Sequence, residues 1–297
     1  MAEIRISIVW AGLAAASMAA MAWLALGGLY LLAFLGVVIL THEAGHLVVA
    51  RWMGMRPVEY FWGFGPDVFS FRRGGCRYGI KALFLGGYVK LLGMTPSSDL
   101  PDGFPEARTY RAASHRGRLA TILAGPAVNL ACAGLAFAGA SLVEGQSLGS
   151  AVADGASDVW FVIAGTAQAL WQWGANIGAY LASLVDASGA TPAPVRFMSP
   201  VTQAQVSGWA VDSGLAPSLR WFGVLSAAVG AVNLLPLPPL DGSHALIAAA
   251  EGAWQRLQPA QPRQLDVAWL LPLAYLTVAL LGFLSVSALV MDLRDVL

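Results

Sequence analysis

The chain has 297 residues, of which 57% are apolar and only 11% charged, and its mean hydropathy is +0.64. A water-soluble domain carries about 25% charged residues, so this composition excludes a soluble enzyme and predicts a helical integral membrane protein. Seventeen basic and seventeen acidic residues cancel to a net charge of zero, which leaves no basic surface for nucleic acid. Cys76 and Cys132 lie in unrelated contexts and indicate neither a disulfide framework nor a thiolate metal cluster.

Several apolar segments approach or exceed the length of a bilayer crossing. The Gly27-Gly28 pair separates the first two segments, and we expect a helical hairpin there rather than one tilted helix. A cleavable signal peptide is the alternative for the first segment, although Arg5 is the only basic residue ahead of it. The predicted spans are residues 7–26, 28–50, about 119–143, about 219–238 and 267–291.

Basic residues concentrate in one part of the chain. Eleven of the seventeen lie between Arg51 and Arg118, whereas residues 144–219 carry five acidic residues against Arg196 alone. Loops rich in Lys and Arg stay on the cytoplasmic side of a membrane. The first block is therefore expected to face the cytoplasm and the second block the outside.

Residues 159–185 carry no charge and have two interpretations. Gln168, Gln172 and Asn176 recur every four residues on one helical face, which favours a helix lying in the membrane interface. A crossing here is the alternative, but it would move residues 186–219 to the basic side.

Residues 58–71 and 76–92 are rich in aromatic and β-branched residues and are punctuated by glycine, a pattern that predicts β-hairpins at the cytoplasmic face. The expected fold class is an all-α polytopic membrane protein of about five transmembrane helices with small, membrane-associated β-hairpins. The expected divisions are an extra N-terminal transmembrane segment at residues 1–27, two core halves at 28–143 and 219–297, and an external or interfacial segment at 144–218.

The sharpest motif is HEAGH at residues 42–46. On a helix, His42 and His46 face the same side and can bind one Zn²⁺, with Glu43 beside a metal-bound water. Arg51 is the first charge after the motif, so at 1.5 Å per residue the two histidines lie roughly 8 to 14 Å inward of that charge. Ionisable groups at such depth indicate a functional site. The alternative is a pair of helix-end histidines held by hydrogen bonds.

A third ligand is found far along the chain, in NLLPLPPLDG at residues 233–242. Asp241 follows an apolar span, where an unpaired carboxylate is costly and a metal-bound one is stabilised. The alternative is that Asp241 caps a helix starting near Ser243. Three prolines break the helix before Asp241, and the irregular backbone that they create is expected to line a cavity rather than to be a simple kink.

Together these motifs resemble the site-2 protease family of intramembrane zinc metalloproteases, most closely the bacterial branch typified by the regulator of sigma-E protease. The resemblance covers most of residues 29–291. It is carried by HEAGH at 42–46, GFGP at 63–66, FLGGYVKLLG at 84–93, AGPAVN at 124–129, SPV at 199–201 and NLLPLPPLDG at 233–242.

The resemblance implies that His42, His46 and Asp241 bind one zinc ion and that Glu43 is the general base. It also assigns residues around the metal. These are Gly63, Phe64 and Gly65 on a membrane-associated hairpin near the active site, Asn233, Pro236 and Pro238 as residues that help hold the substrate, and Asn129 as a structural or active-site-adjacent polar group.

The function implied is a zinc-dependent endopeptidase of the bacterial inner (plasma) membrane. It would cut single-span membrane proteins, such as anti-sigma factors or signal-peptide remnants, near the cytoplasmic side. Members of this branch usually carry PDZ domains, but residues 144–199 are too few for one of ordinary size, which leaves that role to a separate PDZ-like or adaptor partner. The alternatives are an inactive membrane scaffold or binding protein, and a transporter, which would spread polar residues along several spans.

Overall fold

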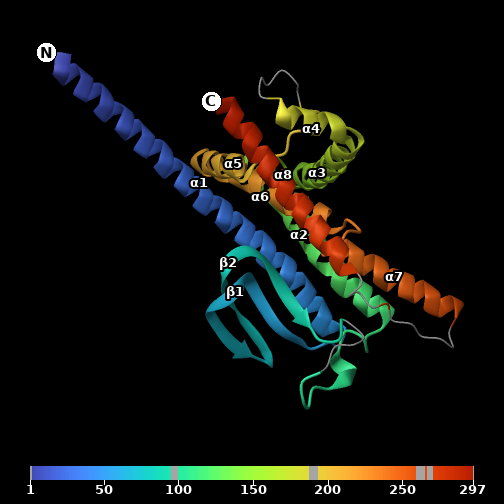
Figure 1. The fold of residues 1–297 in the computed structure, drawn as a ribbon. Coiled ribbons are helices and arrows are strands. Elements are labelled where there is room, and N and C mark those ends of the chain that lie inside the picture. The colour runs from blue at the N-terminus through green and yellow to red at the C-terminus, as the bar shows by residue number, and fades with distance from the viewer. Residues whose placement is uncertain (1, 95–99, 187–192, 259–264, 266–269, 297) are drawn as a thin grey trace.

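The computed structural model describes residues 2–94, 100–186, 193–258, 265 and 270–296. Within these ranges the chain forms eight α-helices, one short 3₁₀ helix and two long strands (Figure 1). In chain order they are α1 (Ala2–Trp52), β1 (Pro57–Arg73), β2 (Cys76–Leu91), the 3₁₀ helix η1 (Glu106–Arg108), α2 (His115–Val143), α3 (Leu148–Ala175), α4 (Ile177–Val185), α5 (Pro200–Asp212), α6 (Leu215–Asn233), α7 (Asp241–Leu257) and α8 (Leu271–Val296).

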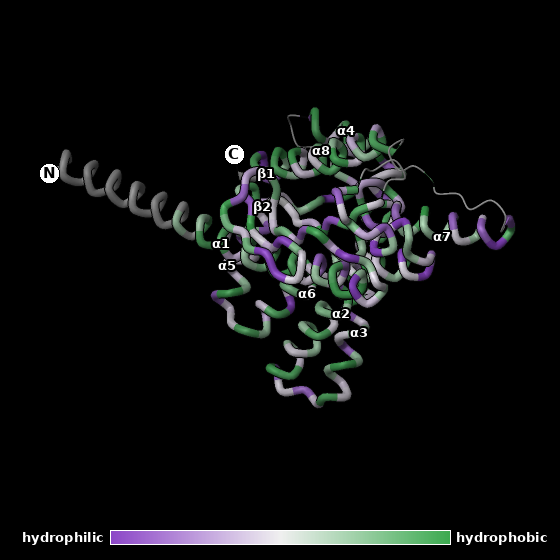
Figure 2. Tube along the Cα trace, turned by 90° about the horizontal axis from the view of Figure 1, so that it is seen from below, coloured by the Kyte–Doolittle hydropathy of each residue, from purple (hydrophilic) through white to green (hydrophobic). Residues whose placement is uncertain are grey.

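Four of these helices are long and apolar enough to cross a membrane: α1 from Leu24 to Trp52, α2, α6, and α8 to Arg294. The predicted class of helical membrane protein is confirmed, and these helices coincide with four of the five predicted spans. Residues 267–269 of the last predicted span lie outside the described residues, and the number of crossings stays a prediction. In Figure 2, α8 is mainly hydrophobic, whereas hydrophilic residues gather on α7.

The predicted hairpin at the glycine pair is wrong, because α1 is one continuous helix of 51 residues (Figure 1). A glycine inside a helix is less favourable than alanine by only about 1 kcal/mol. A helix of this length therefore stays continuous through the glycine pair. A Cβ added to Gly27 would lie 2.3 Å from the carbonyl oxygen of Ala204, whereas one added to Gly28 would meet nothing within 4 Å. Gly27 therefore allows α5 to pack closely against α1. The side chains of predicted span 7–26 lie mostly outside the described residues, so that crossing stays a prediction.

Helix α2 lies at the centre of the bundle and packs against α1, α3, α6 and α7. The ambiguous residues 159–185 form the end of α3 and all of α4, separated at Asn176. Neither helix is among the four that are apolar and long enough to cross, and their position relative to the membrane stays a prediction. The described residues between 144 and 214 form three helices and contain no strand.

Strands β1 and β2 form one antiparallel hairpin that packs along α1, where two separate hairpin-like segments were expected. The first half of β1 pairs with residues 87–91 of β2. Burial raises the pKa of Tyr60 to about 12, so its hydroxyl keeps its proton and donates to the carbonyl of Leu40 at 2.7 Å. The Trp62 ring lies against Gly36, where a Cβ would come within 2.9 Å of it. These contacts hold β1 close to the HEAGH turn of α1.

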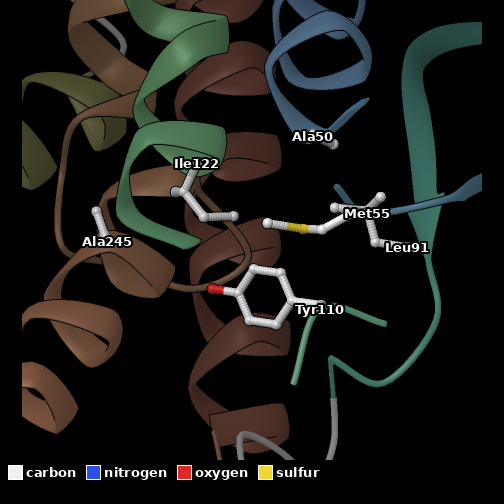
Figure 3. Packing of buried hydrophobic residues seen from close by; sticks show 6 residues of the cluster. All are labelled: Ala50, Met55, Leu91, Tyr110, Ile122 and Ala245. Carbon is white, nitrogen blue, oxygen red and sulfur yellow. The ribbon is translucent and has the colours of Figure 1, made fainter. Parts of the chain in front are cut away.

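A compact apolar cluster lies at the end of the bundle next to that turn (Figure 3). In Figure 3 the side chains of Ile122 from α2 and Met55, which follows α1, point toward each other, and the ring of Tyr110 from the loop before α2 lies beside them. Leu91 at the end of β2 belongs to the same cluster. Burial of these side chains from four segments fixes the hairpin and the two helices relative to one another.

The two central glycines of α1 offer a test of the continuous helix. The Gly27→Ala substitution places a methyl group against the Ala204 carbonyl, and we expect it to lower the free energy of unfolding by about 1 to 3 kcal/mol. The matched Gly28→Ala substitution meets open space and should be neutral or stabilising by up to about 1 kcal/mol. Thermal unfolding of the detergent-purified variants measures both. Equal melting temperatures for the two variants would contradict the α1–α5 contact.

Candidate metal centre and active-site cavity

The HEAGH turn of α1 brings two buried imidazoles together. His42 and His46 are 6% and 8% exposed, and their Nε2 atoms lie 3.2 Å apart. Because the two residues are four apart on a helix, both rings point to the same side, which here faces α2 and α7.

Asp241 is the first residue of α7 and completes the cluster. Its Oδ2 atom lies 2.9 Å from Nε2 of His42 and 3.4 Å from Nε2 of His46. The alternative of a capping aspartate is not observed, because Leu240 is the N-cap residue of α7 and no side chain caps it. The helix N-terminus also favours a carboxylate at this position.

The three side chains fit a zinc ion. They form a group of ligand atoms within 4.8 Å of one another, and the three separations of 2.9 to 3.4 Å match the edge of about 3.3 Å expected for tetrahedral zinc with bonds near 2.0 Å. The buried Oδ2 of Asp241 faces both Nε2 atoms but makes no hydrogen bond of regular geometry with the described residues. Two imidazoles and one carboxylate leave a fourth position for water or substrate, as in catalytic zinc sites.

One face of α2 packs directly on the cluster. The carbonyl of Thr121 lies 2.8 Å from Nδ1 of His46, and the side-chain nitrogen of Asn129 lies 3.2 Å from Nδ1 of His42. Between them, a Cβ on Gly125 would come within 2.3 Å of Nε2 of His46. Thr121, Gly125 and Asn129 recur every four residues, so one helical face orients both imidazoles.

A cavity of about 680 Å³ opens beside the cluster. Glu43 lines it, and Gly87 of β2 packs so close that a Cβ there would lie 3.1 Å from Cγ of Glu43. Phe64 and Asn233 also line the cavity. The cavity therefore joins the ligand cluster to the hairpin and to the end of α6.

The other residues singled out from the sequence lie close by but outside the cavity lining. Gly63 and Gly65 adopt φ values of +90° and +85°, so they shape the bend of β1 that carries Phe64. Pro236 is exposed and Pro238 is buried in the loop between α6 and α7, while the lining proline is Pro239.

Three residues that contribute to the candidate site were not singled out from the sequence. Thr121 acts through its backbone carbonyl, which no side-chain pattern reveals. Gly125 was visible only as part of AGPAVN, and its role depends on the neighbouring helix. His244 lines the cavity three residues after Asp241, and this helical spacing next to a candidate ligand is a signal that could have found it.

A buried ion pair holds α7 against α2. The guanidinium of Arg118 donates to Glu251 at 2.8 Å, and both side chains are 6% exposed. Arg118 also donates to the carbonyl of Tyr110, and Glu251 accepts from the amide of Leu265. Because both charges are buried, removing either partner would leave the other uncompensated. This pair therefore fixes the helix that begins with Asp241.

Gly125 tests the packing of α2 on the ligand cluster. In Gly125→Ala, the new methyl group would overlap both imidazoles, and we expect metal binding to weaken by at least about tenfold, as for other changes around metal ligands. Gly134→Ala on the same helix is the control, since its Cβ would meet only Val159 at 3.7 Å. Metal content after dialysis of the purified variants measures the effect. Full metal retention in Gly125→Ala would contradict this geometry.

Comparison with known proteins places the chain in a family. The family model described as Peptidase family M50 matches residues 30–279, and no PDZ-domain family is found. Zinc metalloprotease Rip1 of Mycobacterium tuberculosis is 44% identical over 103 residues, which cover 35% of this chain and 25% of Rip1. A putative zinc metalloprotease of Clostridium acetobutylicum is 38% identical over 118 residues, or 40% of this chain and 33% of the relative.

A longer alignment joins the chain to a putative zinc metalloprotease of Rhizobium meliloti, at 26% identity over 348 residues that cover 79% of this chain and 89% of the relative. The chain spans only about a quarter of the length of Rip1. The family match nevertheless extends over both motifs that supply the ligand cluster, and it confirms the resemblance drawn from them. The chain belongs to Peptidase family M50, the site-2 protease family of zinc metalloproteases.

Proposed function

We propose that the chain is a zinc-dependent intramembrane endopeptidase that hydrolyses peptide bonds within or near the transmembrane segments of single-span membrane proteins. The observation that carries this proposal is the convergence of His42, His46 and Asp241 beside Glu43 in one cavity. The cavity lies among helices that are apolar enough to cross a membrane. A site in that environment is accessible to the transmembrane segment of a membrane protein rather than to a soluble substrate.

In this proposal His42, His46 and Asp241 hold one zinc ion. A bound zinc ion polarises a peptide carbonyl and makes a water molecule more acidic. Glu43 is the general base, because its carboxylate lies in the same cavity on the same turn of α1. It takes the proton from the attacking water and returns it to the leaving amine. The Arg118–Glu251 pair and Gly125 hold the ligand-bearing helices α1 and α7 in the positions against α2 that this chemistry requires.

A substrate helix hides its carbonyls in backbone hydrogen bonds and must unwind before cleavage. We propose that the unwound segment binds as an extended strand beside the Gly86–Val89 part of β2, which lines the cavity. Phe64 would contact an apolar substrate side chain. Asn233 also lines the cavity and would offer its side-chain amide to the substrate, and the proline-rich loop after it, with Pro236 and Pro238, would help confine the substrate.

We further propose that the protein is a multi-pass protein of the bacterial inner membrane with its active site near the cytoplasmic side. This follows from the eleven basic residues between Arg51 and Arg118, a block that contains the hairpin. Substrate selection of the kind that PDZ domains provide would come from a separate PDZ-like or adaptor partner. Anti-sigma factors and signal-peptide remnants are the proposed classes of substrate.

The Glu43→Gln substitution tests the proposed chemistry. The variant should keep its zinc, because Glu43 is not a ligand, and should lose at least about 100-fold in cleavage rate, because the general base is gone. Asp241→Ala should lose both zinc and cleavage. Glu106→Gln makes the same change at an exposed carboxylate paired with Arg111 and should behave as the unmodified chain.

Cleavage is measured on a panel of tagged single-span membrane proteins in proteoliposomes, and zinc by elemental analysis. Undiminished cleavage by Glu43→Gln would refute the proposed mechanism. An unmodified chain that holds no zinc and cleaves no member of the panel would instead support an inactive scaffold.

Cysteine accessibility tests the proposed orientation. In a background without Cys76 and Cys132, we expect a membrane-impermeant thiol reagent to label cysteines at Ser150 and Met198 from outside the cell, and one at Arg73 only after permeabilisation. All three positions are exposed. Labels on opposite sides for positions 150 and 198 would show that the α3–α4 segment crosses the membrane and would refute its interfacial placement.

A further inference from the structure

We propose that Asn129 is a positioning residue that sets the tautomer of His42. Its side-chain amide donates to Nδ1 of His42 in the metal-free protein, and after a half turn it accepts a hydrogen bond from that same atom when zinc occupies Nε2. This inference rests on the proposed zinc site and concerns how the chain prepares for the metal.

The first observation is a continuous line of hydrogen bonds through the two imidazoles. Asn129 Nδ2 lies 3.2 Å from His42 Nδ1, His42 Nε2 lies 3.2 Å from His46 Nε2, and His46 Nδ1 lies 2.8 Å from the carbonyl of Thr121. The carbonyl can only accept, so His46 Nδ1 carries a proton. Oδ2 of Asp241 lies 2.9 Å from His42 Nε2, and because a carboxylate can also only accept, it favours a proton on that nitrogen, which can then donate to Nε2 of neutral His46. His42 Nε2 is then the donor and His42 Nδ1 the acceptor. The amide nitrogen of Asn129 fits that acceptor.

Zinc binding changes which ring nitrogen must carry the proton, and it does so at His42 but not at His46. A neutral imidazole that binds a metal through Nε2 carries its proton on Nδ1. His46 is already in this form because of the Thr121 carbonyl. His42 must change tautomer, and its new Nδ1–H would point at the N–H of Asn129. Two donors facing each other at 3.2 Å in a buried site are unfavourable.

The side chain of Asn129 can resolve this conflict without movement of the backbone. The residue is completely buried, and its Oδ1 has no hydrogen-bond partner among the described residues. The Asn129 backbone carbonyl has a separate partner, because Ser226 on α6 donates to it at 2.8 Å. A half turn about the Cβ–Cγ bond exchanges the amide nitrogen and oxygen. Oδ1 then accepts from His42 Nδ1.

The side-chain amide of Asn129 can form a hydrogen bond with His42 in both the metal-free and the zinc-bound protein, because it carries a donor and an acceptor. A carboxylate at position 129 could serve only the metal-bound state, and an aliphatic side chain could serve neither. Substitutions at position 129 should therefore separate metal affinity from general packing, without reference to catalysis.

The test measures the zinc dissociation constant of full-length, detergent-purified protein by competition with a chromogenic chelator. Asn129→Leu leaves the Nδ1–H of His42 without an acceptor, and we expect zinc affinity to fall roughly 10- to 100-fold. Asn129→Asp restores an acceptor and should recover most of that loss. Ser226→Ala removes the hydrogen bond to the Asn129 backbone in the same α2–α6 contact and should leave the affinity unchanged.

Thermal unfolding gives a second readout. If Asn129 had a purely structural role, a substitution there would shift the melting temperatures of the metal-free and the zinc-bound protein equally. Relative to the unmodified chain, we expect Asn129→Asp to lower the melting temperature of the metal-free protein, because it breaks the line of hydrogen bonds. Saturating zinc should raise the melting temperature of Asn129→Asp by more than it raises that of the unmodified chain.

Equal zinc affinity in Asn129→Leu and the unmodified chain would overturn the positioning role while leaving the proposed metal site intact. An affinity loss in Ser226→Ala as large as in Asn129→Leu would overturn it in favour of packing. If Asn129→Leu fails to fold, an identical zinc-induced shift in Asn129→Asp and the unmodified chain overturns it. An unmodified chain that binds no zinc would overturn the proposed function as well.

Discussion

The structure depends on one constraint, which is that ionisable side chains buried in an apolar bundle must be satisfied by other protein groups. His42 and His46 are buried and the side chain of Asp241 is 18% exposed, and each buried polar atom left without a partner costs free energy. The backbone of Thr121 and the amide of Asn129 meet the outer nitrogens of the two histidines. The inner atoms lie 2.9 to 3.4 Å from one another, which is the spacing expected between neighbouring ligands of one metal ion, so the cluster fits a bound cation.

Meeting that constraint requires three helices to approach closely, and glycine makes this possible. Gly125 brings the face of α2 against the imidazoles. Gly242 allows the start of α7 to pack on the end of α6, because a Cβ there would lie 2.3 Å from the carbonyl oxygens of Leu234 and Leu235. The buried Arg118–Glu251 pair then ties α7 to α2. Small residues set the distances at these contacts, and the buried Arg118–Glu251 pair holds α7 in place.

The three candidate metal ligands could be predicted because their signals are local and strong. Two histidines four apart on an apolar segment and an aspartate after a proline-rich break are unusual at membrane depth, and the structure brings all three together. The Gly27-Gly28 pair was misread as a joint between two helices. A glycine pair is compatible both with a turn and with close helix packing, and only the position of Ala204 on α5 decides between them. Thr121 could not be predicted, since its contribution comes from the backbone.

The amino-acid sequence alone predicts the class of the protein, the spans that coincide with α2, α6 and α8, the family motifs and the three candidate ligands. These depend on composition, periodicity and short motifs, which belong to single segments. Tertiary contacts establish that α1 is continuous, that α2 contacts both histidines, and that Phe64 and Asn233 share a cavity with Glu43. Such contacts join residues far apart in the chain, and they depend on how closely two backbones approach, which no single segment encodes.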